Sequence, residues 1–196
     1  MSRFLIVGLG NPGREYADNR HNVGYRCVEH LASAHGMSFN RRQKRNAVSL
    51  GTIEKRSVIL AKPRTYMNKS GGPVAALSRF YRVPLARLLV VYDDLDLPPG
   101  TTRLRPSGGS GGHRGMHSVI QQLGSRDFAR LRIGIGRPPG RMDPADYVLR
   151  DFSDAEEEVL ERTLDQATAA IEAWLSEGTE EAMNRYNRSL ENKATD

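Results

Sequence analysis

The chain has 196 residues, with 29 Lys and Arg against 23 Asp and Glu, so its formal net charge is +6. Its hydrophobic fraction of 38% and charged fraction of 27% exclude disordered, collagen-like and low-complexity proteins. The single cysteine excludes an internal disulfide and a cysteine-rich zinc site, and no apolar run is long enough to span a membrane. We therefore expect a cytoplasmic protein with one domain over residues 1–196.

The first half of the sequence alternates between predicted strands and helices. Residues 4–7 form an unbroken apolar run, which is typical of a strand buried on both faces. Residues 23–35 carry apolar side chains at helical spacing and are followed by Gly36, a common residue just after a helix. The other elements predicted in this half are strands over 47–53, 58–61 and 88–92 and a helix over 70–81.

The second half continues the same alternation and then becomes helical. A strand is predicted over 102–105, followed by a glycine loop over 108–112, a helix over 116–123 and a strand over 131–136. From Ser153, which is suited to an N-cap, the spacing predicts a long amphipathic helix, and a shorter helix is predicted over 179–186. This order predicts an α/β fold with one twisted, mixed and largely parallel sheet flanked by helices, and with C-terminal helices.

The charge is divided unevenly along the chain. Residues 1–150 hold 25 Lys and Arg against 10 Asp and Glu, whereas residues 151–196 hold 4 against 13. A net charge of +15 attracts polyanions such as nucleic acids, although simple solubility explains many basic proteins. We expect the acidic helical segment 153–190 to form a separate cap that faces away from the polyanion.

Polar clusters follow four of the predicted strands. Ligands of open α/β sheets bind outside the carboxyl ends of the strands, so we expect these clusters to meet at one rim. Together they offer neutral amides, a histidine, an aspartate and basic side chains. The clusters span residues 8–22, 62–71, 93–96 and 108–114.

The first cluster contains a glycine pattern that is shared with dinucleotide-binding proteins. Gly8, Gly10 and Gly13 spell G-x-G-x-x-G after a strand. In that motif the third glycine lies in a helix packed on the sheet, but here Pro12 and the polar residues 14–22 delay the helix. The sequence therefore disfavours a nicotinamide cofactor.

A histidine in the first cluster is the strongest candidate for catalysis. His21 precedes a predicted helix among polar neighbours, and an aspartate at a strand end, such as Asp93, can fix its tautomer and stabilise its protonated form. Asp96 or Asp94 is interpreted as an exposed turn acid. Cys27 falls within an apolar helical stripe and no serine lies in a G-x-S-x-G motif. A His–Asp pair without a nucleophile or a metal set indicates direct attack of water on an ester-like bond.

Six segments together carry a resemblance to a known family. In chain order they read GLGNPGREY, RHNVG, KPRTYMNKSG, DDLDLPPG, GGSGGHRGMHS and LRIGIG. The segments occur in the same order as in bacterial peptidyl-tRNA hydrolase, which this chain resembles from Phe4 to about Phe152. The resemblance implies a monomeric, cytoplasmic α/β hydrolase that needs no metal or other cofactor. Such an enzyme cleaves the ester between a peptide and the 3′ ribose of tRNA, and so recycles tRNA from stalled or aborted translation.

The resemblance also assigns catalytic roles to individual residues. His21 is expected to be the general base that takes a proton from the attacking water, and Asp93 is expected to stabilise the basic form of His21. Asn11 is expected to read the peptide near its first amide, separating a blocked amino end from a free ammonium. Asparagine suits such a position because its amide both donates and accepts hydrogen bonds without adding charge.

Other positions either extend this site or depart from the family pattern. Asn68 is expected to hold the peptide backbone, with Tyr66 and Tyr16 around the terminal nucleotide. Asn19 stands where the family usually has threonine. Arg114 stands where the family usually has an asparagine that contacts water and peptide; it brings a full charge and accepts no hydrogen bond.

Basic residues are expected to bind the tRNA. Arg105 and Arg132 match family positions that clamp the tRNA 5′ phosphate, a group that suits the fork of a guanidinium, although each is equally well explained as a solvated charge at a strand edge. His113 is interpreted as loop support, and His30, His35 and His117 as helix-face residues. Further contacts to the RNA backbone are expected from Lys62, Lys69, Arg103, Arg126, Arg130, Arg137 and Arg141.

Two other functions are weighed against the hydrolase. A module of the same fold that binds RNA or protein without catalysis would be expected to lack His21 or Asp93, and both are present. A nucleotide-dependent oxidoreductase would be stabilised by its cofactor. The sequence leaves open the peptide-length preference, the tRNA selectivity and whether the loop over residues 137–145 closes over substrate.

Overall fold

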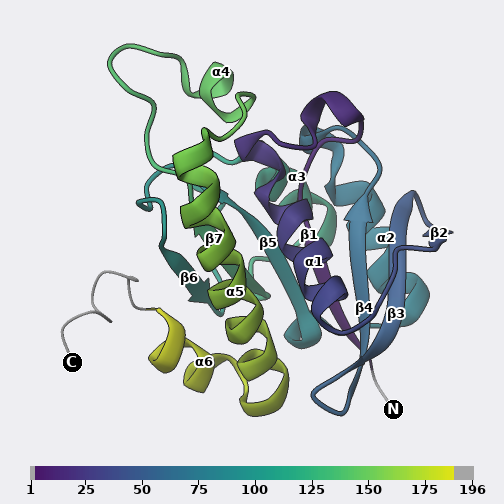
Figure 1. Ribbon diagram of the computed structural model, residues 1–196. Helices are drawn as coiled ribbons and strands as arrows, with labels where there is room; N and C mark the ends of the chain where they lie inside the picture. Colours follow the sequence, from purple (N-terminus) through teal and green to yellow (C-terminus); the bar gives the residue numbers. More distant parts are fainter. Residues whose placement is uncertain (1–2, 188–196) are drawn as a thin grey trace.

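The computed structural model describes residues 3–187, which form a seven-stranded sheet covered by helices on both faces (Figure 1). The strand order is β2-β3-β4-β1-β5-β7-β6. The central strands β4, β1, β5 and β7 are parallel, whereas β2, β3 and β6 run antiparallel to their neighbours at the two edges. The predicted mixed sheet with a parallel centre is therefore confirmed. The strands are β1 (Phe4–Gly8), β2 (Arg41–Gln43), β3 (Asn46–Ile53), β4 (Arg56–Pro63), β5 (Leu88–Asp94), β6 (Thr102–Arg105) and β7 (Ala129–Gly134).

The helices divide between the two faces of the sheet. Helices α1 and α5 cover one face, and α2 and α3 cover the other. Short 3-10 turns η1 (Arg14–Tyr16), η2 (Arg20–Asn22), η3 (Met67–Lys69) and η4 (Leu85–Arg87) precede several of the elements. The helices are α1 (Val23–Ala34), α2 (Gly71–Tyr81), α3 (Arg114–Leu123), α4 (Pro144–Val148), α5 (Asp154–Glu177) and α6 (Thr179–Tyr186). In the described residues, no helix has the length and apolar character that crossing a membrane requires.

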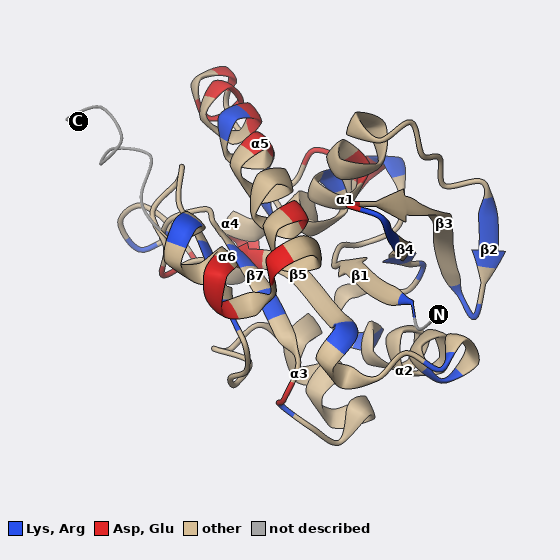
Figure 2. Cartoon of the chain, turned by 90° about the horizontal axis from the view of Figure 1, so that it is seen from below, with Lys and Arg blue, Asp and Glu red and all other residues tan. Residues whose placement is uncertain are grey.

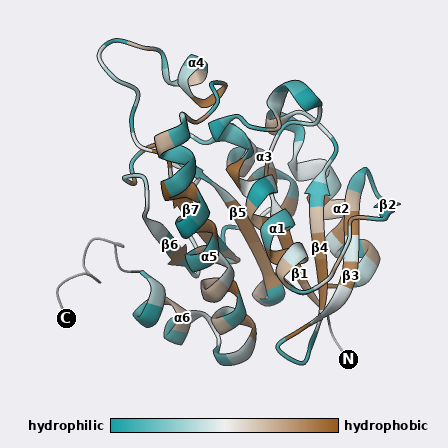
Figure 3. Cartoon of the chain, in the orientation of Figure 1, coloured by the Kyte–Doolittle hydropathy of each residue, from teal (hydrophilic) through white to brown (hydrophobic). Residues whose placement is uncertain are grey.

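The central strands supply apolar side chains to both faces. In β1, Ile6 packs toward α1 and α5, while Leu5 and Val7 pack toward α2 and α3. Successive side chains of a strand point to opposite faces, so a strand covered on both sides reads as a continuous apolar run. The same arrangement in β5 produces the most hydrophobic colours at the centre of the molecule (Figure 3).

The elements predicted from apolar patterns are confirmed, with shifts of one or two residues at some ends. One strand and one α-helix of the described residues were not predicted, and neither were the four 3-10 turns. Strand β2 contains only Arg41, Arg42 and Gln43, so it carries no apolar signal and is held by pairing with β3. Helix α4 has five residues, which is too short to show a helical period, and it begins after Asp143, whose side chain accepts a hydrogen bond from Ala145 N–H.

The acidic C-terminal region is not a separate cap, which corrects the prediction from its charge. Helix α5 buries Leu160, Leu164 and Ile171 in the main core beside α1 and the sheet. Ser153 caps it as predicted, in a capping box with Glu156. Its acidic side chains face α1 and α6 as well as solvent, so the negative charge is concentrated on that side of the molecule (Figure 2). Residues 188–190 of the predicted segment lie outside the described residues.

Candidate active site

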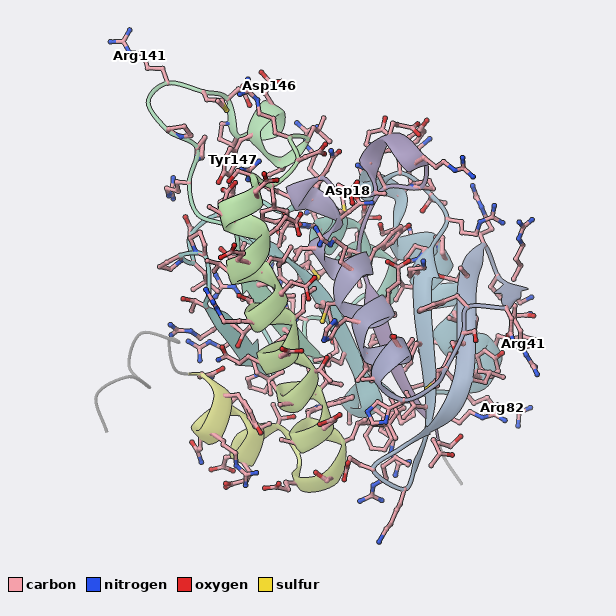
Figure 4. All side chains as sticks on the ribbon, viewed as in Figure 1. Asp18, Arg41, Arg82, Arg141, Asp146 and Tyr147 are labelled. Carbon is pink, nitrogen blue, oxygen red and sulfur yellow. The ribbon has the colours of Figure 1, made fainter. Side chains whose placement is uncertain are left out.

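A cavity of about 560 Å³ opens at the carboxyl ends of the central strands, where the polar clusters were predicted to meet. Asn11 follows β1, Asp93 is the second-to-last residue of β5, and Tyr66 and Asn68 follow β4. His21 enters from η2, and His113 and Arg114 enter from the start of α3. Helix α4 forms the opposite wall; Asp146 and Tyr147 mark its position above the sheet (Figure 4).

His21 is fixed by the residues on either side of it. The backbone N–H of Asn11 donates to Asn22 Oδ1 at 2.8 Å, and Asn22 Nδ2 donates to the backbone oxygen of Asn11 at 2.9 Å. On the other side, the guanidinium of Arg20 donates to both carboxylate oxygens of Glu156 at 2.8 Å and to the backbone oxygen of Asp151 at 2.7 Å. The 3-10 turn that carries His21 is therefore tied both to β1 and to the start of α5.

Asp93 holds two histidines at once. Its side chain is only 3% exposed. His21 Nδ1 lies 3.0 and 2.9 Å from the two carboxylate oxygens of Asp93, and His113 Nε2 lies 2.8 Å from Oδ1. The two rings are neighbours, with centroids 5.0 Å apart.

The hydrogen bonds determine the tautomers of both rings. His113 Nδ1 accepts the backbone N–H of Met116 at 3.1 Å, so that nitrogen carries no proton and Nε2–H donates to Asp93. His21 likewise donates Nδ1–H to the carboxylate of Asp93. His21 Nε2 therefore keeps its lone pair, and no residue among 3–187 hydrogen-bonds to it. A neutral imidazole with a free nitrogen in a cavity is equipped to accept a proton.

The surroundings adjust the acidity of this pair. Burial lowers the pKa of His21, but the negative charge and the hydrogen bonds of Asp93 outweigh it, so the pKa lies above the usual 6.5. The positive charge of Arg114 opposes this rise. Burial by itself would raise the pKa of Asp93, but the two adjacent histidines hold it well below its usual range. Asp93 thus remains ionised and favours the protonated form of His21, which corrects the expectation that it stabilises the basic form.

His21, Asp93 and His113 also form a group with suitable atoms for a metal ion. The hydrogen bonds argue against that use. His113 Nδ1 already accepts from Met116 N–H, so binding a metal through Nε2 would require an imidazole without a proton on either nitrogen. We therefore interpret the group as a proton-transfer arrangement.

Asn11 presents a hydrogen-bond donor to the cavity. Its Oδ1 accepts the backbone N–H of Met67 at 2.7 Å, which fixes the orientation of the amide. The Nδ2 group has no partner among the described residues. An incoming ligand therefore meets the N–H groups of Asn11 rather than its oxygen.

The other predicted substrate-binding residues are placed unevenly around the cavity. Tyr66 is 59% exposed at the rim, and Asn68 and Arg114 are also exposed there. Among the described residues, the guanidinium of Arg114 has no hydrogen-bond or ion-pair partner. Tyr16 lies in η1 and is not part of the cavity lining.

The predicted phosphate-binding residues lie on the antiparallel strands β6 and β7, away from the cavity lining. The register places Arg105 opposite Arg130 and Arg103 opposite Arg132, so all four side chains share one face of this strand pair. The Nε of Arg132 donates to Asp94. Arg105 is partly exposed.

Several predicted RNA contacts have other partners in the structure. Arg130 is 1% exposed and donates to the backbone oxygens of Gly108 and Gly109, so its prediction as a contact to RNA is wrong. It supports the glycine loop instead. Lys62 pairs with Glu29, and Arg137 pairs with Asp96.

The remaining cysteine and histidine predictions agree with the packing. Cys27 is buried in the core, and burial raises the pKa of its thiol to about 12, which makes it unsuitable as a nucleophile. His30 and His35 lie on α1 and pair with Asp165 and Glu172 of α5. His117 is exposed on α3.

The sequence analysis missed the second histidine of the site. His113 does support its loop, as predicted, because it caps α3. Its contact with Asp93 was not predicted. The available signal was its position in a cluster at a strand end, but sequence position gives no direction for the side chain. The role of Asn22 in fixing Asn11 was missed for the same reason.

Comparisons with known proteins agree over nearly the whole chain. Residues 5–195 match the family model described as peptidyl-tRNA hydrolase. The peptidyl-tRNA hydrolase of Chloroflexus aggregans is 54% identical over 185 residues, which cover 94% of this chain and 98% of that protein. The chloroplastic peptidyl-tRNA hydrolase of Arabidopsis thaliana is 53% identical over 176 residues, or 89% of this chain and 61% of that protein. The crystal structure of peptidyl-tRNA hydrolase from Acinetobacter baumannii has a TM-score of 0.90 at 37% identity and covers 96% of this chain and 97% of that chain.

Proposed function

The chain belongs to the peptidyl-tRNA hydrolase family, and we propose that it acts through a water molecule activated by His21. The enzyme is an ester hydrolase whose substrate is peptidyl-tRNA. The observation that carries the proposed mechanism is the free Nε2 of His21 in a cavity whose buried carboxylate, Asp93, holds the opposite ring nitrogen.

The proposed reaction has two steps. A water molecule gives a proton to His21 Nε2 while its oxygen attacks the carbonyl carbon of the ester. The tetrahedral intermediate then expels the 3′ oxygen of the ribose, which takes the proton back from His21. Peptide acid and tRNA are released, and His21 returns to its neutral form. General base catalysis of this kind contributes about 10²–10⁴ in rate.

Asp93 supports both steps through the charge of His21. The protonated ring that forms after the first step carries a positive charge, and the ionised carboxylate at 2.9 Å stabilises that charge. His113 donates a further hydrogen bond to Asp93 and limits its movement. The pair is therefore oriented before the substrate arrives.

Asn11 provides a physical basis for preferring a blocked substrate. An acylated amino group offers a carbonyl oxygen, which accepts a hydrogen bond from the free Nδ2 of Asn11. A free ammonium has no lone pair and leaves that donor unpaired in a mostly buried position. A site built to pair a polar group strongly rejects an analogue that lacks it.

The rim is proposed to hold the ends of the tRNA and the peptide. Asn68 has a side-chain amide suited to the peptide backbone, and the exposed ring of Tyr66 offers a surface on which the terminal base can stack. Tyr16 lies outside the cavity lining, so its contact would be with a more distant part of the terminal nucleotides.

We assign the 5′ phosphate of the acceptor stem to Arg105 and Arg132. The ion pair with Asp94 uses Nε of Arg132 and leaves its terminal nitrogens for a bidentate phosphate contact. Arg103 lies on the same face and has a buried Nε without a partner among the described residues. We also propose that the enzyme acts as a monomer, in the cytoplasm where translation takes place.

The test is release of the N-acetyl-aminoacyl group from its tRNA, measured with and without a chelator. Wild-type enzyme should cleave the blocked substrate rapidly, leave unblocked aminoacyl-tRNA intact and be unaffected by the chelator. His21→Ala should lose at least about a hundredfold in kcat while binding tRNA nearly as well. If more than about a tenth of the rate remains, His21 is not the base. Salt-sensitive tRNA binding without cleavage by the wild type would favour a binding module.

A further inference from the structure

The positive charge of the chain is concentrated in one stretch. Residues 30–92 contain 12 Lys and Arg and a single acidic residue, Glu54. Residues 1–29 contain four Lys and Arg against three Asp and Glu, and residues 93–150 contain nine against six. Of the 15 excess positive charges in residues 1–150, 11 therefore belong to residues 30–92, whereas strands β6 and β7 together hold four arginines.

Six exposed cations of this stretch form what we call the hairpin surface. Four of these cations lie on β2 and the β2–β3 turn, at one edge of the sheet, and the other two follow β4; Arg105 and Arg132 lie at or beside the other edge. Strand β2 is basic along its length, and Arg41 points outward from the molecule (Figures 2 and 4). None of the six has an ion-pair partner among residues 3–187. The hairpin surface consists of Arg41, Arg42, Lys44, Arg45, Arg64 and Lys69.

The hairpin surface is firmly connected to the rim of the cavity. Asn46 is fully buried, and its Nδ2 donates to the backbone oxygens of Lys44 at 2.9 Å and Pro73 at 3.1 Å. The backbone N–H of Arg64 donates to the backbone oxygen of Arg45 at 2.8 Å. Arg64 is two residues before Tyr66, which lines the cavity. The cations thus continue directly from the catalytic rim on a rigid support.

The cations in the turn are not required by the shape of the turn. Lys44 and Arg45 have φ of 48° and 61°, a left-handed conformation that asparagine or glycine adopts at lower cost. The β3–β4 turn has the same conformation with Glu54 and Lys55, whose charges cancel. The conformation of the β2–β3 turn therefore does not explain why both of its positions carry cations. These two side chains add to the positive charge beside the rim.

We propose that the hairpin surface binds the phosphate backbone of the substrate tRNA, so that the RNA is held on both sides of the cavity. The inference rests on the assigned substrate, whose 3′ end must reach His21 past this rim. Exposed Arg and Lys side chains without carboxylate partners suit phosphate oxygens, and such contacts set affinity without reading sequence. The surface therefore strengthens binding of every tRNA alike and takes no part in the chemical step.

The test removes two cations and compares long and short substrates. The variant Arg42→Gln/Arg45→Gln is compared with Lys55→Gln/Arg162→Gln, which loses the same charge at exposed positions far from the rim. KM and kcat are measured for N-acetyl-aminoacyl-tRNA and for the same group on a CCA trinucleotide, at 50 and 200 mM salt. Circular dichroism confirms that each variant is folded.

The hairpin variant should have a raised KM for the full tRNA with kcat unchanged. As salt rises from 50 to 200 mM, each phosphate contact lowers the affinity for tRNA by about 3.5-fold. A variant that has lost two contacts should therefore lose about tenfold less affinity over this range than the wild type does. The trinucleotide substrate and the control variant should behave as wild type. An unchanged KM for full tRNA overturns the proposal. Weaker binding of the variant to ribosomal RNA would not support it, because the proposed ligand is the substrate tRNA. Equal losses on both substrates also overturn it, because the defect would then lie in the catalytic site. Failure of the wild type to cleave would instead contradict the proposed function.

Discussion

At the scale of single residues, one buried carboxylate organises the site. Asp93 accepts hydrogen bonds from His21 and His113, and the bond from His21 fixes the tautomer of His21. In His113, the bond from Met116 N–H fixes the tautomer as well. The nitrogen of His21 that faces the cavity is unprotonated as a consequence. Arg114 adds a positive charge near His21, so the pKa of His21 is raised by Asp93 and lowered by Arg114.

Replacing the carboxylate of Asp93 tests the tautomer argument. In Asp93→Asn, one oxygen becomes an NH₂ group that faces an N–H of a histidine, so His21 loses its orientation. We expect kcat to fall by about 10²–10⁴ and the acid limb of the pH–rate profile to move to lower pH, because the carboxylate no longer raises the pKa of His21. Asp127→Asn, at an exposed position outside the cavity lining, is the control and should retain wild-type kinetics.

Arg114→Asn tests the opposing charge. Arg114 lowers the pKa of His21, so its removal should raise that pKa further. The base is active only when unprotonated, and the acid limb of kcat/KM should therefore move to higher pH. Above this limb the activity should stay within about tenfold of wild type, since general base catalysis itself is intact. Arg126→Asn provides the matched loss of an exposed charge. An unmoved limb, or complete loss at every pH, would contradict this account.

At the scale of elements, the site depends on the contact between η2 and the start of α5. Arg20 is buried, stacks over the ring of Tyr147 at 4.4 Å and holds Glu156, which also completes the capping box of α5. One side chain thereby connects α4, α5 and the turn that carries His21. Although α5 contributes no residue to the cavity lining, it helps to set the position of the base.

Arg20→Met should therefore reduce stability and activity together. It leaves Glu156 and two backbone oxygens without their donor, and we expect a loss of about 2–4 kcal/mol in the free energy of unfolding. We also expect a lower kcat at temperatures where the variant is folded. Urea unfolding and steady-state kinetics measure the two effects. Arg26→Met removes the neighbouring pair with Glu157, which does not touch the turn, and should leave kcat unchanged.

At the scale of the whole molecule, the two signs of charge are separated. Acidic side chains gather on α5 and α6, whereas cations lie on the hairpin surface and on strands β6 and β7. Some acidic side chains of α5 pair with Arg26, His30 and His35 of α1 within the fold. The surface around the cavity is thus left positive toward an approaching polyanion.

This separation predicts a steep dependence on salt. KM for peptidyl-tRNA should rise strongly between 50 and 200 mM salt, because counterions released from the RNA supply much of the binding free energy. Hydrolysis of an N-acetyl-aminoacyl trinucleotide should change little over the same range. Equal salt dependence for both substrates would mean that the basic surfaces do not hold the RNA.

The sequence alone determined the strands, most helices and the place of the site. Continuous apolar runs such as residues 88–91 reveal buried strands, and polar residues at their ends mark the rim, because these signals are local. The contact between His21 and Asp93 followed from the same logic and is present. The short elements β2 and α4 were not predicted because they lack a hydrophobic period.

Only the tertiary structure decided which partner each polar group takes. The backbone N–H of Met67, 56 residues from Asn11, orients the amide of Asn11 so that its NH₂ group faces the cavity. Asp93 accepts a second hydrogen bond from His113, which lies 20 residues away in the sequence. Arg130 is inside the fold and Arg45 outside it, although both are arginines near basic neighbours. Periodicity fixes which elements form, but hydrogen-bond partners depend on how distant segments pack, because a buried donor or acceptor must pair with whichever group the packing brings within reach.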